Sequence, residues 1–139
     1  MHGTFFYNGP GLLEVNNKSV NHPLDGDGMI NSVSFCNGRA FYRNRFVKTK
    51  DYLIENAAGE PVSRGVFGTN RQGGPFANSC DLILKNTANT NVIYWGGRLL
   101  ALWESGEPYR LNPYTLDTIS LEDLDKQLLP VRGLFRAGD

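Results

Sequence analysis

Two acidic residues alternate with two glycines in the stretch Val20-Asn21-His22-Pro23-Leu24-Asp25-Gly26-Asp27-Gly28-Met29-Ile30. Glycine permits positive φ and lets the backbone pass close to a neighbouring segment. An aspartate in a turn can accept a hydrogen bond from a backbone N–H two residues further on. We therefore predict a rigid structural turn that leads into a strand and is built from His22, Asp25, Gly26, Asp27 and Gly28.

The composition favours strands over helices. The chain has 139 residues, of which 40% are hydrophobic, 12% are aromatic and 16 are glycine. A globule of this size buries about 68% of its unfolded surface, which is enough for one domain with a core. Aromatic strands joined by glycine turns are typical of an all-β fold, and we predict that class here.

The charge balance does not indicate a class of binding partner. Lysine plus arginine and aspartate plus glutamate both number 14, so the formal net charge is zero, and no field attracts nucleic acid. The sequence has neither a long apolar run for a membrane span nor an export signal, which predicts a soluble, cytoplasmic or plastid-type protein that is not secreted. Cys36 and Cys80 lack metal-type spacing, and we expect them to be reduced and at least partly buried.

Two hairpins are predicted from their turns. Asn37-Gly38 separates two strand-forming runs, and Gly96-Gly97 separates residues 92–95 from residues 98–104. Both limbs of this second hairpin are nearly all apolar, so we expect each to be covered on both faces. Consecutive antiparallel hairpins are typical of propeller blades, although two blades cannot close into a ring. Such a partial propeller would leave sheet edges uncovered.

The remaining segments give weaker signals. We expect strands at residues 3–7, 62–69 and 108–111, and an alternating apolar run at 80–85. Turns or loops are expected at 8–11, 72–75 and 112–115, an irregular connection at 51–61, and a polar segment outside the core at 86–91. One helical turn is expected with Ser120 as its cap.

Arginines alternate with aromatic residues in residues 39–47. This pattern occurs in single-strand nucleic-acid platforms, but the neutral chain favours arginines that reach Asp25, Asp27 or Glu55. The two aspartates lack the spacing and the distal bidentate glutamate of a calcium loop.

Several sequence words occur together and in order along the chain. The words are Tyr7-Asn8-Gly9-Pro10-Gly11, His22-Pro23-Leu24-Asp25-Gly26-Asp27-Gly28-Met29, Tyr42-Arg43-Asn44-Arg45-Phe46-Val47-Lys48-Thr49, Arg64-Gly65-Val66-Phe67-Gly68-Thr69, Lys85-Asn86-Thr87-Ala88-Asn89-Thr90-Asn91-Val92, and Leu100-Ala101-Leu102-Trp103-Glu104 followed by Leu111-Asn112-Pro113-Tyr114-Thr115-Leu116. In these words the chain resembles the carotenoid cleavage dioxygenase family, also called the retinal pigment epithelial membrane protein or carotenoid oxygenase family. Within it the words are most similar to the apocarotenoid oxygenases.

The resemblance implies a seven-bladed β-propeller that holds Fe(II) through four histidines and cleaves a carbon–carbon double bond of a carotenoid or apocarotenoid with O2, giving two carbonyl products. Residues 1–139 would be an N-terminal fragment of that one domain, with about the first two blades, their connecting loops and no separate second domain. Imidazole is a suitable ligand for Fe(II). The family also includes members that contact membranes peripherally.

The resemblance assigns roles to a few side chains. Glu104 matches a glutamate that accepts a hydrogen bond from an iron-binding histidine, whereas by its residue type alone it could pair with Arg98 or Arg110. Phe67, Thr90 and Trp103 match positions along the substrate tunnel; without the family, the two aromatic residues would be assigned to the core. His22 matches a histidine with a structural role in the turn.

The chain departs from the family pattern at its end. The family continues into Phe-x-Ala-His-Pro, whose histidine is the first iron ligand, but here Phe135-Arg136-Ala137 is followed by Gly138-Asp139. Gly138 stands where that ligand is expected, and the other ligands would lie further on. We therefore expect no catalytic residue, no metal ligand and no bound iron in this chain. The alternative function is a non-catalytic module of the same fold that binds an apolar ligand or a partner.

Overall fold

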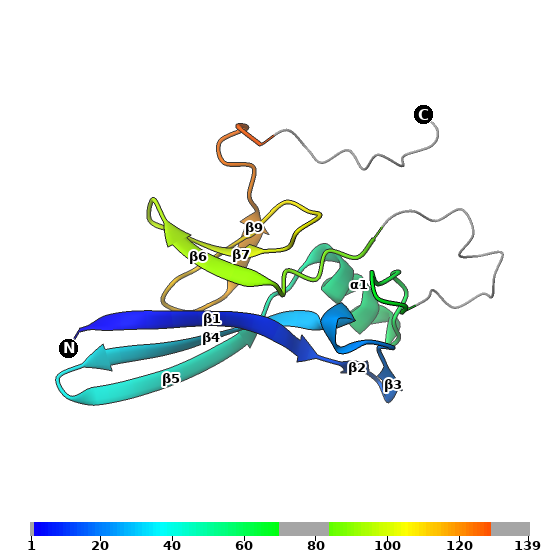
Figure 1. Ribbon diagram of the computed structural model, residues 1–139, viewed down its shortest axis with the longest axis horizontal. Helices are drawn as coiled ribbons and strands as arrows, with labels where there is room; N and C mark the ends of the chain where they lie inside the picture. The colour runs from blue at the N-terminus through cyan, green and yellow to red at the C-terminus, as the bar shows by residue number, and fades with distance from the viewer. Residues whose placement is uncertain (1, 70–83, 129–139) are drawn as a thin grey trace.

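The computed structural model describes residues 2–69 and 84–128, and its strands form two main antiparallel sheets (Figure 1). The first sheet has the order β1-β4-β5, with β1 at Gly3–Leu12, β4 at Asp27–Cys36 and β5 at Arg39–Phe46. The second has the order β6-β7-β8-β9, with bounds Asn91–Trp95, Arg98–Leu102, Tyr109–Leu111 and Thr118–Leu121. A small pair, β2 (Glu14–Val15) and β3 (Lys18–Ser19), follows β1.

The two predicted hairpins are confirmed. Asn37 and Gly38 have φ of 49° and 73° and join Cys36 to its register partner Arg39. Gly96 and Gly97 have φ of 57° and 77° and join β6 to β7. Two successive residues with positive φ give the turn twist that matches antiparallel strands.

The strand β1 is longer than predicted. Residues 8–11 were expected to form a turn, but they continue the pairing with β4, and the register shifts only between Pro10 and Leu12. Proline is tolerated here because β1 lies at the edge of its sheet, where a missing N–H breaks no ladder. Gly11 is needed for close packing, since a Cβ at this position would lie 2.5 Å from Cβ of Met29.

Residues 51–61, expected to be irregular, contain all but the first residue of the helix α1 (Lys50–Ala58). The hydroxyl of Thr49 caps it by accepting a hydrogen bond from the Tyr52 N–H at 3.0 Å, and Gly59 ends it with φ of 69°. The expected strand at residues 62–69 is also wrong, because only Arg64 makes a β-bridge there, to Leu84.

Ser120 lies in β9 and caps no helix. Leu124, Asp125 and Lys126 have φ of 51°, 59° and 66°, so the chain after β9 makes a left-handed turn. Strand β8 and the turn after Asn112 are as predicted.

The core lies where the second sheet packs against the start of β4. Its largest fully buried apolar side chains include Ile30, Val47, Leu99 and Leu111. Phe6 of β1 stacks on Tyr94 of β6 with ring centroids 6.5 Å apart, which links the two sheets at their edges.

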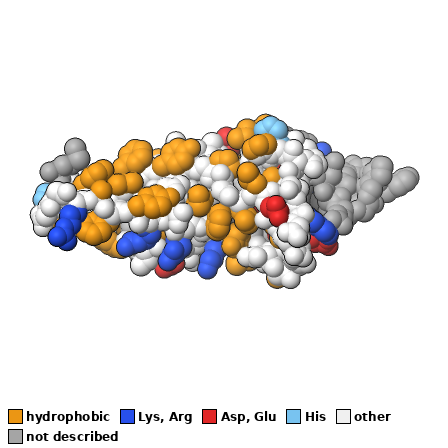
Figure 2. Space-filling view, turned by 90° about the horizontal axis from the view of Figure 1, so that it is seen from below, with side chains coloured by type: hydrophobic (Ala, Val, Ile, Leu, Met, Phe, Trp, Pro, Cys, Tyr) orange, Lys and Arg blue, Asp and Glu red, His pale blue; other side chains and the backbone are white. Residues whose placement is uncertain are grey.

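The outer strands are more exposed than the sequence predicted. On β6, Tyr94 and Trp95 are 57% and 66% exposed, so this strand is not covered on both faces. Register pairing places Phe5 beside Val33 and Tyr42 on one face of the first sheet, and apolar side chains form a band along this sheet (Figure 2). Cys36 is exposed rather than partly buried, and Cys80 lies outside the described residues.

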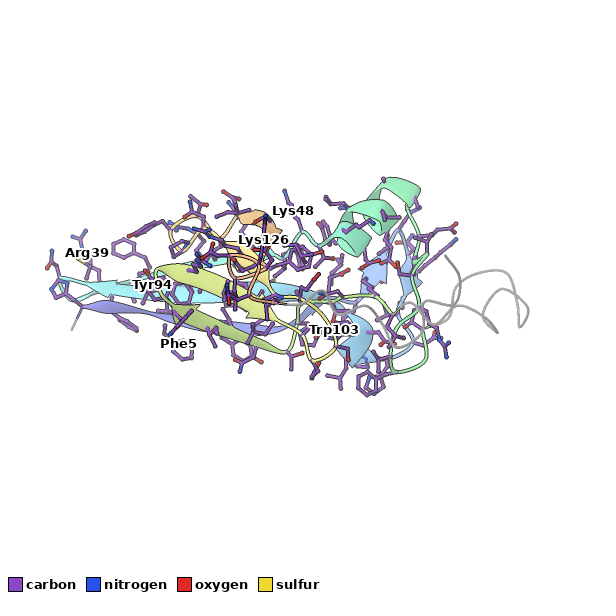
Figure 3. The ribbon with its side chains drawn as sticks, turned by 90° about the horizontal axis from the view of Figure 1, so that it is seen from above. Phe5, Arg39, Lys48, Tyr94, Trp103 and Lys126 are labelled. Carbon is purple, nitrogen blue, oxygen red and sulfur yellow. The ribbon has the colours of Figure 1, made fainter. Side chains whose placement is uncertain are left out.

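Figure 3 shows the hairpin tip at Arg39 at one end of the molecule and Trp103, which follows β7, nearer its middle. In the described ranges no helix is long and apolar enough to cross a membrane. The all-β prediction holds, with one helix added, and the glycine-acid turn occupies the junction between the sheets and α1.

Candidate functional site

The turn at residues 22–28 joins segments that are distant in sequence. It contains the 3-10 helix η1 (Pro23–Asp25), whose cap is His22; its Nδ1 accepts a hydrogen bond from the Leu24 N–H at 3.2 Å. The carboxylate of Asp25 accepts hydrogen bonds from the N–H groups of Phe67, at 2.9 Å, and Thr69, at 3.0 Å. The prediction that Asp25 bonds a nearby N–H was therefore wrong, because its partners are 42 and 44 residues further along the chain.

The glycines of the turn are needed for close approach rather than for positive φ. Gly26 has φ of −69°. A Cβ on Gly28 would lie 2.2 Å from the carbonyl oxygen of Ala88, and the Gly28 N–H donates to the Thr87 oxygen at 2.8 Å. Residues 85–89 are thereby held directly against the turn.

A buried charge cluster lies beside this contact. The Nζ atom of Lys85 lies 2.9 Å from Oδ2 of Asp27 and 2.6 Å from Oε2 of Glu55. The other oxygen of Glu55 accepts from the N–H groups of Val62 and Ser63 at 3.1 and 2.9 Å. The arginines of β5 were expected to pair with these acids, but Lys85 takes that place.

The cluster has one negative charge more than it can neutralise. Burial raises the pKa of Asp27 to about 6, and the ammonium of Lys85 limits the rise. Burial would lower the pKa of Lys85, but the attraction and hydrogen bonds of its two carboxylates outweigh burial and raise it. Oδ1 of Asp27 is buried without a hydrogen-bond partner among the described residues.

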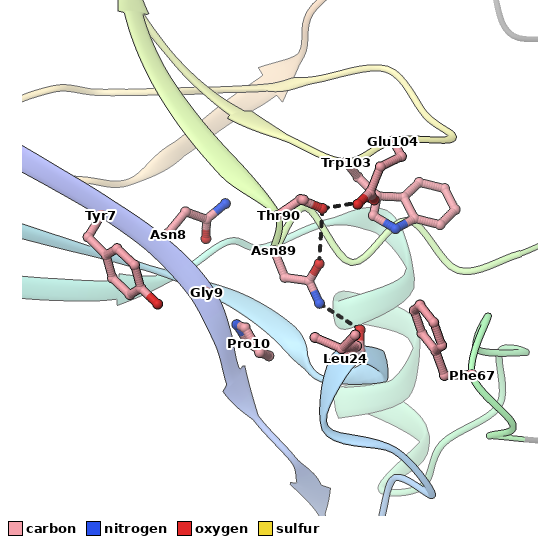
Figure 4. Close-up of a pocket in the computed structure, with 10 residues that line it drawn as sticks. All are labelled: Tyr7, Asn8, Gly9, Pro10, Leu24, Phe67, Asn89, Thr90, Trp103 and Glu104. Atoms are coloured by element: carbon pink, nitrogen blue, oxygen red, sulfur yellow. Dashed lines mark hydrogen bonds between the residues drawn. The ribbon is translucent and has the colours of Figure 1, made fainter.

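A pocket of about 250 Å³ opens beside the turn (Figure 4). It is bounded by β1, the turn, the loop before β6 and the end of β7. The lining residues are Tyr7, Asn8, Gly9, Pro10, Leu24, Phe67, Asn89, Thr90, Trp103 and Glu104.

The four residues that the sequence assigned to the tunnel and to the metal environment meet in this pocket. Thr90 and Glu104 are joined directly, since Oγ1 of Thr90 donates to Oε2 of Glu104 at 2.9 Å. Phe67 is 52% exposed and stacks on the ring of His22 with centroids 5.0 Å apart, so it is not a core aromatic. Trp103 is half-buried at the pocket wall.

The alternative pairing of Glu104 with Arg98 or Arg110 is not seen among the described residues. Arg98 binds Glu122 at 3.1 Å and Asp125 at 2.7 Å. Arg110 lies 3.9 Å from the same Glu122. The carboxylate of Glu104 is exposed at the pocket, with Thr90 as its hydrogen-bond donor in the described part of the chain.

The side chains present do not form a metal site. Within residues 2–69 and 84–128, no group of three or more histidine, cysteine, aspartate or glutamate side chains could hold an ion. His22 uses Nδ1 as the cap of η1. Gly138, the position of the expected first ligand, lies outside the described residues.

Sequence reasoning missed half of the pocket wall. Asn8, Gly9 and Pro10 were assigned to a turn or loop after a strand ending at Tyr7, although the continuous strand β1 places all four along one side of the pocket. Asn89 was placed in a polar connection outside the core, but it is only 7% exposed. Its one sequence signal was its position directly before Thr90.

Comparison with known proteins identifies this architecture. The solved structure of a threonine-to-alanine variant of the Synechocystis apocarotenoid oxygenase, a β-propeller, superimposes with a TM-score of 0.89 at 48% identity and covers 94% of this chain and 27% of the oxygenase. The fold is therefore a partial β-propeller. The chain belongs to the retinal pigment epithelial membrane protein family, which it matches over residues 1–137.

Curated relatives are similar over most of the chain. The apocarotenoid-15,15'-oxygenase of Synechocystis is 50% identical over 125 residues, which are 89% of this chain and 26% of the relative. A carotenoid cleavage dioxygenase 7 of rice, named as chloroplastic, is 40% identical over 127 residues, which are 88% of this chain and 20% of the relative. The chain thus spans between a fifth and about a quarter of the length of these relatives.

Solved variants of the Synechocystis enzyme carry substitutions of a threonine, of a tryptophan and of the glutamate directly after that tryptophan. The threonine precedes the tryptophan by the same number of residues as Thr90 precedes Trp103, and Glu104 follows Trp103 directly. The spacing of the studied residues matches that of the pocket residues here.

Proposed function

We propose that this chain is the N-terminal part of a propeller-domain oxygenase that cleaves a carbon–carbon double bond of an apocarotenoid or carotenoid with O2, giving two carbonyl products. The observation that carries the proposal is the pocket in which Phe67 and Trp103 adjoin the hydrogen-bonded pair Thr90–Glu104. The names of the similar oxygenases support the reaction class. The proposal includes a cytoplasmic or plastid location and peripheral contact with a membrane that supplies the apolar substrate.

The pocket provides one wall of a larger site. Complete small-molecule sites have volumes of about 300–1,000 Å³ and are mostly apolar with a few placed polar groups. The pocket here holds about 250 Å³. The rings of Phe67 and Trp103 and the side chains of Pro10 and Leu24 give it an apolar surface suited to a conjugated hydrocarbon chain.

Glu104 supplies the polar group. An ionised carboxylate accepts about four hydrogen bonds, and Thr90 provides one. We propose that another comes from the ring N–H of a histidine that binds Fe(II), an arrangement that fixes the ring orientation and raises its basicity. The described residues do not hold this ion, so its ligands would come from other parts of the enzyme, and the bound iron would supply the activation of O2.

The reaction is tested in a chimera that joins residues 1–137 of this chain to the remainder of the Synechocystis enzyme, beginning at its His-Pro motif. Cleavage of an apocarotenal is followed by chromatography of both carbonyl products in air and under nitrogen. We expect O2-dependent cleavage. The same chimera with Gly138-Asp139 retained in place of His-Pro should be inactive. A folded, iron-loaded chimera that binds the polyene without cleaving it would favour the binding-module alternative.

The role of Glu104 is tested in the same chimera by Glu104→Gln. Removing a carboxylate that supports a metal-binding histidine typically lowers metal affinity or activity by about 10–100-fold. Glu107→Gln is the matched control, because only the backbone oxygen of Glu107 has a bond in the described structure, to Asn86. Iron content measured by mass spectrometry and kcat/KM should fall for Glu104→Gln alone. Equal values for both variants would exclude the role.

A further inference from the structure

The side-chain amide of Asn89 is fixed in one orientation. Its Nδ2 donates to the carbonyl oxygens of Leu24 and Gly26, both at 2.8 Å, and these are the backbone of the glycine-acid turn. Asn89 is 7% exposed, so water cannot readily replace these bonds. Because both amide hydrogens are used, Oδ1 must face the other way, and it lies 3.4 Å from Oγ1 of Thr90.

The hydroxyl of Thr90 has one hydrogen and two acceptors. Oε2 of Glu104 lies at 2.9 Å and Oδ1 of Asn89 at 3.4 Å. A hydrogen bond to an ionised carboxylate is shorter and stronger than one to a neutral amide, so the hydrogen points to Glu104. Oδ1 of Asn89 can only accept, so it is the weaker and more distant competitor for this hydrogen.

The backbone holds Thr90 from the opposite side. Its N–H donates to the oxygen of Leu102 at 3.1 Å, next to Trp103 and Glu104 in the chain. Thr90 thus lies between the end of β7 and the residue that is bonded to the turn. We propose that Asn89 is a positioning residue: its two hydrogen bonds to the turn fix the backbone of the next residue, Thr90, whose hydroxyl in turn orients the carboxylate of Glu104 (Figure 4). Its catalytic meaning depends on the function proposed above; the positioning itself does not.

Asn86 provides a matched control from the same loop. Its Nδ2 donates to the Glu107 oxygen at 2.9 Å and its Oδ1 accepts from the Ala88 N–H at 3.0 Å. Asn86 therefore also makes side-chain bonds to the backbone, but none to Thr90. Loss of loop stability alone would affect Asn86→Ala and Asn89→Ala in the same way, whereas loss of positioning would affect Asn89→Ala only.

The first measurement is the carboxyl carbon resonance of Glu104, observed by NMR in the full 139-residue chain labelled with carbon-13. We expect this resonance to move in Asn89→Ala and in Thr90→Val, which removes the hydroxyl and keeps the shape, and to stay in place in Asn86→Ala. An unchanged resonance in Asn89→Ala overturns the proposal. If a variant of the chain does not give a folded spectrum, the same resonance is measured in the chimera.

The second measurement is a double-mutant cycle in the chimera. Asn89→Ala should lower kcat by about 10-fold or more with KM little changed, as expected for a residue that supports a metal-binding environment. In the Glu104→Gln background the further loss should be less than about twofold, because the two substitutions interrupt one pathway. Independent, multiplicative losses would overturn the proposal. If the chimera is inactive but the Glu104 resonance moves as expected, the oxygenase function fails and the positioning stands.

Discussion

Replacing Asp27 by asparagine should remove the loss of stability that ionisation of Asp27 causes between pH 4 and pH 6. Asp27 is 1% exposed and binds the ammonium of Lys85, which it shares with Glu55. Its Oδ1 has no hydrogen-bond partner in the described residues. The asparagine has nearly the same shape and keeps one oxygen for Lys85, but it cannot ionise.

Ionisation of Asp27 lowers the free energy of unfolding as pH rises, which is opposite to the effect of a carboxylate whose pKa falls on folding. The pKa of Asp27 rises from 3.8 to about 6 on folding because of burial, with Lys85 opposing the rise. Between these values the native state binds more protons than the unfolded state, so stability falls as pH rises. One unit of pKa corresponds to about 1.36 kcal/mol, which makes the ionisation of Asp27 destabilising by roughly 3 kcal/mol above pH 6. The destabilisation is absent below pH 4.

The assay is urea unfolding of the 139-residue chain at several values between pH 4 and pH 8, followed by tryptophan fluorescence. The difference in unfolding free energy between Asp27→Asn and the wild type should grow in favour of the variant as pH rises through 4–6 and then level off. Glu60→Gln, at the exposed pair with Lys18, is the control and should keep the wild-type slope. A constant difference between Asp27→Asn and the wild type would refute the reasoning.

Two further substitutions test the same junction by urea unfolding at pH 7. Lys85→Met leaves two buried carboxylates without their cation and should lower the unfolding free energy by about 3–5 kcal/mol, whereas Lys18→Met at the exposed pair should cost less than about 1 kcal/mol; equal losses would contradict the burial argument. Gly28→Ala places a Cβ 2.2 Å from the backbone oxygen of Ala88 and should cost about 1–3 kcal/mol. Gly9→Ala meets only the movable Tyr7 side chain and should cost less; a neutral Gly28→Ala would contradict the close approach.

Secondary structure could be predicted where turn-forming residues, such as Asn-Gly or Gly-Gly pairs, mark the ends of strands. Asn37-Gly38 and Gly96-Gly97 fix their hairpins through positive φ, which needs no tertiary context. The helix α1 could not be predicted from periodicity, because its buried residue is the charged Glu55 while Leu53 and Ile54 are exposed. Its signals were the cap Thr49 and the terminal glycine rather than an apolar stripe.

The site was predictable only in part. Family words located Thr90, Trp103 and Glu104, and the structure brings them together. The partners of Asp25 could not be predicted, because they are backbone N–H groups more than 40 residues further on, and neither their residue types nor their family word marks a contact with the turn. Asn89 was missed for a similar reason: a buried amide that bonds two carbonyls has no sequence signature apart from its neighbours.

The glycine-acid turn also has a consequence for synthesis on the ribosome. Its partners follow late in the chain, with Lys85 58 residues after Asp27 and Asn89 63 residues after Gly26. At about 5–20 residues per second, translation needs roughly 3–13 seconds to deliver them. During this interval Asp27 lacks its ammonium partner and must stay hydrated, and Ile30 of β4 lacks the second sheet that buries it. The nascent chain is therefore most in need of a chaperone before residue 89 leaves the exit tunnel.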